Sequence, residues 1–552
     1  MTDPIQRRSR PPEAFIVAAA GFAVLVLMVW WLDNVHINTT NGLFKSLTVR
    51  LWRDDPALAT LDRSNYLYFP LMAVLCRLLD LLGVYAGLPW KQLAVVNAAF
   101  GAACLGIVFA FVRALTGRRD IALLATLLHG ASAFFLILSI TNEDILPGYT
   151  LVLAAMALAA LWFDQPTLRR VAVVGALFTL GWLMEWRLLF PTLPALVLAL
   201  VLAPLSLRAR AANIAVLVLS ILLTTEAVAL AWDGHNGSGQ ILQLLWPGKG
   251  VDSGWAGFAS SKFALLVAGV GQYLLGGRNV VVWTVDSRLP FELAVSSIVQ
   301  LVLLVSVLRL GWRAPAPSRV RAVLAVFIGT FAAGEVLNLY SQPQDPQMQI
   351  NVMPWLTVAW ALVLAHLLPP DARPLWRGGA LALPLAVLAY NMVVLVPERG
   401  RDSLWRGVVG ELERNTAPER TVFLYHGFEG IVSWQNLMWA WRWSGACDIA
   451  PAPAAQPRFK WIGVTHSLVQ HPERSAADHA SALRREIDCA LDKGYRVITR
   501  PIWEQKTELD AVLTTLNAAQ HVPTLQKTFL DNYTTVPAFT TSVGLYLEVR
   551  RR

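Results

Sequence analysis

The chain has 552 residues, of which 55% are hydrophobic and 15% are charged, and its formal net charge is +9. Soluble domains carry about 25% charged residues, so the composition excludes an ordinary soluble protein. Long apolar runs recur through the first 396 residues. A helix needs about 20 apolar residues to cross the hydrocarbon core, and only helices satisfy their backbone within runs of this length. The sequence therefore predicts a polytopic α-helical membrane protein.

The N-terminal segment has the charge pattern of a membrane-targeting sequence. Arg7, Arg8 and Arg10 precede an apolar run at 15–32, which ends in Trp-Trp-Leu-Asp. A cleaved signal peptide has a shorter apolar region followed by small residues. We therefore expect an uncleaved signal anchor.

Eleven apolar segments are predicted to cross the membrane. Their ranges are 14–32, 92–113, 120–140, 147–163, 171–189, 191–206, 212–232, 290–310, 320–338, 351–368 and 378–396. Two further apolar segments, 66–84 and 262–276, remain. Whether these two cross is decided by loop charge, because cytoplasmic loops are enriched in Lys and Arg.

The arginines of the loops fix the expected topology. If the two remaining segments do not cross, one side of the membrane receives every short arginine-rich loop. The short loops 141–146 and 339–350 on the other side contain no Lys or Arg. We therefore expect a cytoplasmic N-terminus and an extracytoplasmic C-terminus. The two remaining segments become juxtamembrane or re-entrant helices in the outer loops 33–91 and 233–289.

The first outer loop begins with a carboxylate at the membrane surface. Asp33 follows the first span directly, and an amphipathic helix is expected near 41–52. A polar turn comes next, and the segment from Asn65 to Pro70 starts another helix with aromatic residues and a proline. This order places Asp33 beneath a structured lid.

Further carboxylates collect at the outer ends of the spans. Glu143 and Asp144 lie in the second outer loop, Glu185 in the third, and Asp345 in the loop before the tenth span. A carboxylate within a span costs about 2.5–3.5 kcal/mol on insertion scales. Several of them together indicate an aqueous cavity that is open to the outside. The alternative is that these loop acids are simply solvated.

Amides and cations of the outer loops are candidates for ligand binding. Gln344 and Gln347 stand in an amide-rich loop and can both donate and accept hydrogen bonds, which suits sugar hydroxyls. The alternative is a proline-bounded turn that caps the next helix. His36 can bind a hydroxyl or a phosphate, or simply lie at the interface. Arg187 and Lys249 are candidates for a lipid phosphate, and an ion pair with Glu185 or Glu143 is the alternative for Arg187.

Residues 398–552 have ordinary charge and no spanning run, which predicts a separate extracytoplasmic α/β domain after a transmembrane domain at 1–397. The expected strands are 421–427, 458–466, 496–503 and 543–551, and the expected helices are near 431–442, 475–494 and 506–519. This segment contains no GxGxxG and no GxxxxGK[ST], so we expect no nucleotide site there. Cys447 and Cys489 can pair outside the cytoplasm or stay as two separate thiols.

The order of these features resembles the GT-C superfamily of integral-membrane glycosyltransferases, especially the protein O-mannosyltransferase and lipid A aminoarabinose transferase branch. The residues that carry the resemblance are Asp33-Asn34, the helix near 41–52, Asp54-Asp55-Pro56, Asn65 to Pro70, and Glu143-Asp144. The resemblance covers most of residues 1–396. It implies a polyprenyl-phosphate sugar as the donor and a hydroxyl of a glycan, lipid or protein as the acceptor.

The resemblance also implies a role for each candidate residue. Asp33 would be the general base of an inverting transfer, and Arg187 and then Lys249 would hold the departing lipid phosphate. Glu143 and Asp144 would orient the acceptor, position the sugar or help to hold a divalent cation, whose involvement stays open. Tyr66, in the aromatic-proline helix start, joins Glu185, His36 and the loop residues Gln344, Asp345 and Gln347 as substrate-binding candidates.

The expected location is a bacterial inner membrane, with membrane lipid as a partner and no nucleic acid. Three other classes remain open at this point. A polysaccharide polymerase or ligase also has about ten to twelve spans, but usually relies on arginine-rich outer loops. A lipid-linked sugar transporter needs polar groups deep in several spans. A non-catalytic scaffold would use its terminal domain to bind glycans.

Overall fold

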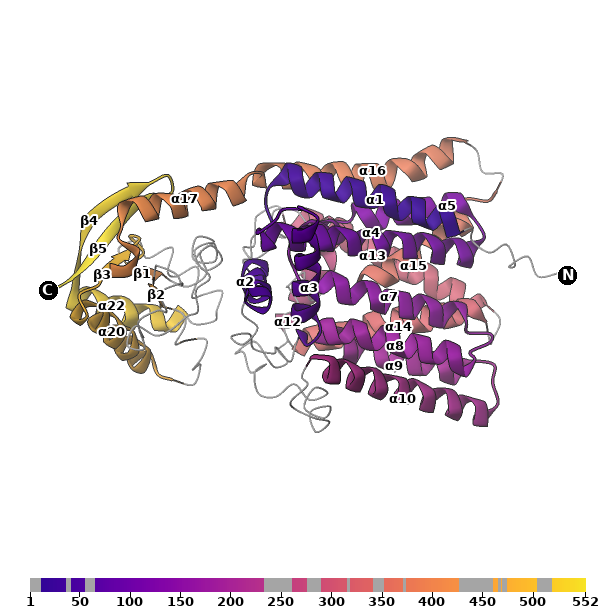
Figure 1. Ribbon diagram of the computed structural model, residues 1–552. Coiled ribbons are helices and arrows are strands. Elements are labelled where there is room, and N and C mark those ends of the chain that lie inside the picture. Colours follow the sequence, from indigo (N-terminus) through magenta and orange to yellow (C-terminus); the bar gives the residue numbers. More distant parts are fainter. Residues whose placement is uncertain are drawn as a thin grey trace. The chain divides into compact units, whose positions relative to one another are not determined.

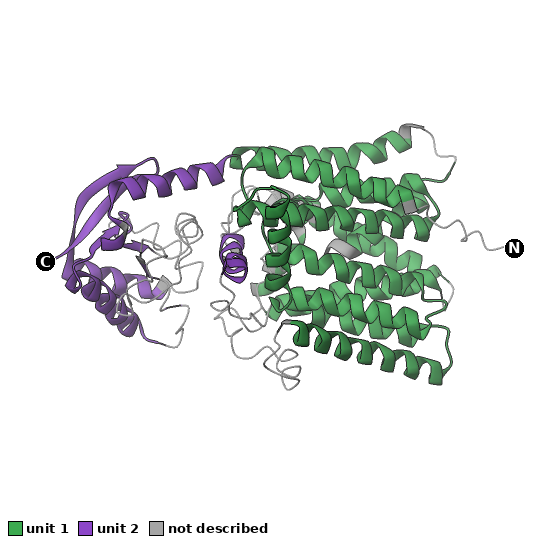
Figure 2. Cartoon of the chain, viewed as in Figure 1, with its two compact units in different colours: residues 1–38, 55–251, 255–399 green, residues 39–54, 252–254, 400–552 purple. Residues whose placement is uncertain are grey.

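The computed structural model describes most of the chain. The described residues are 11–35, 41–54, 65–232, 261–275, 289–314, 318–340, 352–370, 374–425, 460–464, 468, 474–503 and 519–552. The chain divides into two compact units (Figure 2). Unit 1 comprises Met1–Asn38, Asp55–Val251 and Trp255–Arg399, and unit 2 comprises Thr39–Asp54, Asp252–Gly254 and Gly400–Arg552.

Unit 1 is helical throughout its described part (Figure 1). Its long or apolar helices are α1 (Pro11–Leu32), α4 (Pro89–Thr116), α5 (Arg119–Ala131), α6 (Ala133–Ile140), α7 (Ile145–Leu161), α8 (Leu168–Met184), α9 (Leu189–Leu202), α10 (Leu207–Trp232), α13 (Leu289–Arg313), α14 (Arg319–Tyr340), α15 (Val352–Leu367) and α16 (Pro374–Leu395). Each segment that the sequence predicts to span coincides with one of these helices, except that 120–140 forms the pair α5 and α6. The two remaining apolar segments form α3 (Tyr68–Leu81) and α12 (Ser261–Gln272). Figure 1 shows α3 running across the direction of the long helices.

Several of these helices have the length and composition of membrane spans. Within the described residues, five helical stretches qualify, and the bent pair of α5 and α6 makes a sixth. The five are Pro12–Leu32, Pro89–Thr116, Leu207–Ala231, Arg319–Tyr340 and Trp376–Asn415. The shorter helices Ile145–Leu161, Trp186–Leu202 and Trp355–Leu367 are also apolar. The chain is therefore an integral membrane protein that crosses the bilayer several times.

The single span predicted at 120–140 is broken at Ser132. α5 and α6 meet there at 68°, and Ser132 itself has an extended backbone. The N–H groups of Ala133 and Phe134 lose their helical partners and donate instead to the carbonyls of Leu274 and Tyr273, at 3.3 and 3.4 Å. A broken helix is tolerated at membrane depth where neighbouring segments satisfy the freed backbone groups.

A side chain from another helix completes this arrangement. The Asn391 amide donates to the carbonyls of Ala131 and Leu274, at 2.8 and 3.1 Å. Asn391 therefore joins the end of α5 to the segment that follows α12. The sequence alone shows no proline at the break, which explains why a continuous helix was predicted.

Helices α7 and α8 approach each other closely at two glycines. A Cβ atom on Gly181 would lie 2.6 Å from Cγ2 of Val152 and 2.7 Å from the carbonyl oxygen of Gly148. Because one of these neighbours is backbone, a side chain at Gly181 forces the two helices apart. The close approach sets the spacing between the start of α7 and the end of α8.

Gly181→Ala is therefore expected to destabilise the protein by about 1–3 kcal/mol, the usual cost of overpacking. Gly329→Ala is the matched control, because its Cβ would lie 3.6 Å from Cβ of Ala195, an ordinary contact. Thermal unfolding in detergent should show a lower melting temperature for the first variant only. Equal melting temperatures for the two variants would mean that the contact between α7 and α8 is not tight.

Unit 2 contains helix α2 (Asn41–Asp54) and a five-stranded mixed sheet. Among its described residues, the strands are β1 (Thr421–Tyr425), β2 (Lys460–Gly463), β3 (Arg496–Thr499), β4 (Tyr533–Thr541) and β5 (Gly544–Arg551). The described α-helices that accompany the sheet are α17 (Arg401–Asn415), α20 (Ala476–Asp492) and α22 (Val522–Asn532). The order in the sheet is β2-β1-β3-β5-β4, with β1 parallel to β2 and β3, and β5 antiparallel to β3 and β4. Apolar side chains from α20 and α22 form one core with the sheet, as the stacking of Trp503 on Phe529 illustrates.

The predicted strands at 421–427, 458–466, 496–503 and 543–551 contain β1, β2, β3 and β5, and the predicted helix at 475–494 contains α20. Strand β4 was missed because its sequence, Tyr-Thr-Thr-Val-Pro-Ala-Phe-Thr-Thr, is rich in threonine and interrupted by Pro537. Proline is accommodated here because β4 lies at the sheet edge and is irregular next to Pro537. The predicted helices at 431–442 and 506–519 lie outside the described residues. Cys489 forms no disulfide with another described residue, and Cys447 lies outside the described part.

Candidate functional site

The site begins where α1 ends. Asp33 follows Leu32 in the left-handed region, with φ of 45°, which an aspartate tolerates better than most residues. Its Oδ1 atom lies 2.8 Å from Nζ of Lys91, in the first turn of α4. The Asp33 side chain is 25% exposed and that of Lys91 is 7% exposed. A partly accessible carboxylate thus pairs with a buried ammonium group.

The segment after α1 is also held by residues that follow α16 (Pro374–Leu395). The Asn34 amide donates to the carbonyl of Glu398 at 2.8 Å. Arg399 donates to the carbonyl of Trp31 at 3.0 Å, and its guanidinium lies over the Trp31 ring at 5.1 Å. These contacts fix the backbone on both sides of Asp33 and so orient its carboxylate.

The second outer loop lies beside the same segment. The N–H of Asn142 donates to the carbonyl of Val35 at 3.4 Å. The Asn97 amide, also on α4, donates to the carbonyls of Thr141 and Glu143, at 2.7 and 2.6 Å. Lys91 and Asn97 are about 9 Å apart along the helix axis, so one helix binds both Asp33 and the loop that carries Glu143.

Asp144 is fixed by the segment that precedes α3. Asn65 donates to Oδ2 of Asp144 at 2.7 Å and to the carbonyl of Met184 at 2.8 Å. The N–H of Leu67 also donates to the carbonyl of Leu183 at 2.9 Å. Residues 65–67 therefore bridge the start of α7 and the end of α8. Asp144 and Glu143 are both buried, so their surroundings are polar but screened from bulk water.

Two tyrosines lie in this region. Tyr66 and Tyr68 are both buried. Burial raises the pKa of the Tyr68 phenol well above its usual range, and the charges of Asp144 and Glu143 raise this pKa further. Tyr68 therefore keeps its proton at neutral pH, so its hydroxyl can donate a hydrogen bond beside the two carboxylates.

Glu185 and Arg187 form a bidentate ion pair at the end of α8. Nε and Nη2 of Arg187 donate to the two carboxylate oxygens of Glu185 at 2.6 and 2.7 Å, and the Arg187 N–H donates to Oε1 at 3.2 Å. The Glu185 side chain is buried, whereas that of Arg187 is partly exposed. This is one of the two ion pairs that the sequence analysis gave as alternatives for Arg187.

The structure therefore brings Asp33, Glu143 and Asp144 into one region of unit 1, and Glu185 adjoins it through Met184. The other predicted substrate-binding residues lie outside the described residues: His36, Lys249, Gln344, Asp345 and Gln347. Within the described part of the chain, no group of three or more His, Cys, Asp or Glu side chains is arranged to hold a metal ion.

Four residues of the site were not singled out from the sequence: Asn65, Tyr68, Lys91 and Asn97. Lys91 had a signal, because it is the last residue of the predicted outer loop 33–91 and thus a cation at the outer surface. Asn97 stands inside a predicted span, where a polar side chain needs a partner. Asn65 and Tyr68 belong to a segment that was recognised as a whole, and nothing local indicated which of its residues reach Asp144.

The chain shares its overall fold with solved structures of the protein ArnT. The chain is similar over 96% of its length to 97% of ArnT from Cupriavidus metallidurans bound to undecaprenyl phosphate, with a TM-score of 0.53 and 12% sequence identity. The apo structure of the same protein matches equally, with a TM-score of 0.53, 12% identity, and coverage of 96% of this chain and 98% of that one. No family model and no curated protein matches the sequence.

Proposed function

We propose that the protein is a membrane glycosyltransferase that moves a sugar from a polyprenyl-phosphate donor to an acceptor hydroxyl at the outer face of the membrane. The observation that carries the proposal is the pair formed by Asp33 and Lys91 at the end of α1. Oδ1 of Asp33 and Nζ of Lys91 lie 2.8 Å apart. A transfer from a lipid phosphate requires two such groups, a base for the acceptor hydroxyl and a cation for the phosphate. The likeness to ArnT with undecaprenyl phosphate supports the same class of donor.

In the proposed reaction, Asp33 takes the proton of the acceptor hydroxyl as its oxygen attacks the anomeric carbon. General base catalysis of this kind contributes about 10²–10⁴-fold to a rate. The bond between the anomeric carbon and the phosphate oxygen breaks on the opposite side, so the configuration inverts. The polyprenyl phosphate leaves as an anion, and Lys91 stabilises the negative charge that develops on it.

Lys91 replaces Arg187 as our first candidate for the phosphate. Lys91 pairs with Asp33, the proposed base, whereas Arg187 pairs with Glu185. Arg187 remains a second candidate, since part of its side chain is exposed. Lys249 keeps its proposed role in the donor site on sequence grounds.

The buried polar groups around the pair would position the substrates. Glu143 and Asp144 would accept hydrogen bonds from sugar or acceptor hydroxyls, and Tyr66 and Tyr68 would border the same space. The amides and the carboxylate of the loop at 342–351 would contact donor hydroxyls. A divalent cation would require carboxylates such as Asp144, and EDTA treatment of the purified protein tests for this requirement.

The proposed topology has eleven spans, a cytoplasmic N-terminus and an extracytoplasmic α/β domain at 398–552, in a bacterial inner membrane. It rests on the distribution of arginine. The pair of Asp33 and Lys91 would then lie at the outer surface, where a lipid-linked sugar rather than a nucleotide sugar is the expected donor. Cysteine accessibility at the exposed ends of α7 and α8 tests the orientation.

The proposal is tested with purified protein in lipid, offered a panel of undecaprenyl-phosphate sugars. We expect one donor to be consumed, with undecaprenyl phosphate released, when mass spectrometry follows the lipids. Donor that moves intact across the bilayer of a proteoliposome, without being cleaved, would contradict the proposal and favour a transporter. Consumption only of donors that carry long glycans would favour a polymerase or ligase.

Asn65→Ala is expected to lower the transfer rate by about 10- to 100-fold, because small displacements of a positioned group are costly. The variant removes the amide that donates a 2.7 Å hydrogen bond to Asp144, and it leaves Asp33 and Lys91 unchanged. Asn213→Ala is the control, since Asn213 is also buried but its amide donates to the carbonyl of Ala209 in α10. Equal rates in the two variants would remove Asp144 from the proposed site.

A further inference from the structure

A pocket lies between α7, α8, α9 and α10 at the ends of α7 and α8 that are remote from Asp33. Its volume is about 30 Å³, two to three times the roughly 10–15 Å³ that one water needs. The lining is apolar apart from Arg170, with Phe163, Val171, Ala199 and Leu217 as typical members. Helix α7 has 17 residues, so this pocket is roughly 25 Å from the candidate site along the bundle.

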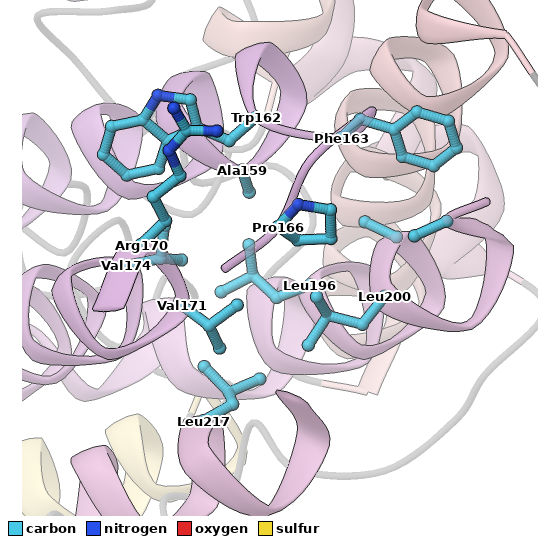
Figure 3. Close-up of a pocket in the computed structure, with 12 residues that line it drawn as sticks. Ala159, Trp162, Phe163, Pro166, Arg170, Val171, Val174, Leu196, Leu200 and Leu217 are labelled. Atoms are coloured by element: carbon cyan, nitrogen blue, oxygen red, sulfur yellow. The ribbon is translucent and has the colours of Figure 1, made fainter. Parts of the chain in front are cut away.

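One guanidinium group lies at the edge of the pocket. Figure 3 shows Arg170 over the ring of Trp162, with the apolar side chains on the other side of the pocket. The distance from the guanidinium carbon to the ring centroid is 5.5 Å. Arg170 also donates to the carbonyl of Gln165 at 2.8 Å. Among the described residues, this bond occupies one of the five N–H donors of the guanidinium.

A second arginine, Arg210, contacts a residue that lines the pocket. Nε of Arg210 donates at 3.2 Å to the carbonyl of Ala203, which belongs to the lining. Arg169 and Arg208 are exposed neighbours on the same helices. The acidic residue in the connection between α7 and α8 is Asp164, and Arg319 pairs with it. The border of the pocket is therefore positively charged.

The surface next to the pocket is apolar, as expected of a surface that faces lipid. Val173 on α8 and Leu198 and Leu202 on α9 are exposed apolar side chains. A dry apolar cavity binds apolar groups rather than water, and in a bilayer the neighbouring apolar groups are acyl chains. Basic pockets between membrane helices on the cytoplasmic side bind anionic headgroups, and the arginines predict that this end is cytoplasmic.

We infer that this pocket binds one anionic glycerophospholipid of the inner leaflet. Part of an acyl chain occupies the apolar pocket, and the phosphate accepts hydrogen bonds from Arg170 and Arg210. The site is separate from the proposed transfer site and exists whether or not the protein transfers sugars. Its occupant ties together the ends of four helices and so stabilises the fold.

The experiment measures lipid binding by native mass spectrometry, with phosphatidylglycerol titrated against phosphatidylcholine of the same chains. We expect one phosphatidylglycerol to bind preferentially. Arg170→Gln and Arg210→Gln should each weaken this binding about fivefold, the equivalent of roughly 1 kcal/mol per arginine near a membrane surface. Ala159→Leu, which fills the pocket without changing charge, should weaken the binding as well.

Arg169→Gln is the matched control, because it removes the same charge from the adjacent, exposed residue of α8. It should leave the preferential binding unchanged. Equal losses in Arg169→Gln and Arg170→Gln, with no effect of Ala159→Leu, would reduce the site to a general surface attraction and overturn the inference. Displacement of the bound phosphatidylglycerol by undecaprenyl phosphate at equal concentration would also overturn it. Melting temperatures in phosphatidylcholine alone verify that each variant is folded.

Discussion

Asp33→Asn is expected to slow sugar transfer by about 10²–10⁴-fold, because it removes the general base but keeps the shape of the side chain. The substitution leaves the hydrogen bonds of Asn34 and Arg399 on either side intact, so the turn after α1 should persist. The rate is measured as release of undecaprenyl phosphate from the donor that the wild-type protein consumes. Turnover close to that of the wild type would remove Asp33 from the role of base and leave Glu143 and Asp144 as the candidates.

A control must separate the loss of a base from the loss of an ion pair. Asp120→Asn makes the same chemical change in a carboxylate that is paired with Arg118 at the start of α5, at the end of α4 remote from Lys91. We expect this variant to transfer sugar at the wild-type rate. Melting temperatures for both variants then show whether any change in rate follows from unfolding.

The layout of the helices was predictable because hydrophobicity is a local property of the sequence. Each predicted span coincides with a helix or a helix pair, and the two segments that loop charge excluded from spanning form the separate helices α3 and α12. The bend at Ser132 was not predictable, because the groups that hydrogen-bond the backbone freed at the bend come from elsewhere in the chain. Asn391 reaches Ala131 across 260 residues of sequence.

The candidate site was predictable only in part, for the same physical reason. A carboxylate directly after a span has few directions to point, and this consideration identified Asp33, Glu143 and Asp144. Their partners depend on tertiary contacts, such as that of Asn65 with Asp144, 79 residues away. Arg187 and Glu185 are two residues apart, so an ion pair between them could be proposed from the sequence. The sequence could not decide whether Arg187 forms this pair or binds a phosphate.

Lys91→Gln is expected to lower the rate of transfer by about 10²–10³-fold, the usual effect of removing one stabiliser of a developing anion. It should also raise the KM for the donor, because the ammonium group attracts the phosphate before the reaction. The variant leaves Asp33 without the cation that lies at 2.8 Å, which is expected to cost about 1–3 kcal/mol of stability. Lys91→Arg keeps the charge and should retain more activity than Lys91→Gln.

The two members of the pair can be distinguished by the binding of undecaprenyl phosphate itself. Lys91→Gln should weaken this binding, since it removes the attraction between the ammonium group and the phosphate. Asp33→Asn should leave the binding unchanged or tighten it, since it removes a negative charge next to that phosphate. The double variant should recover stability, because neither charge is then left without its partner, but it should stay inactive. If Lys91→Gln slows transfer while binding undecaprenyl phosphate as tightly as the wild type, Lys91 serves only to orient Asp33, and the phosphate must be held by Arg187 or by Lys249.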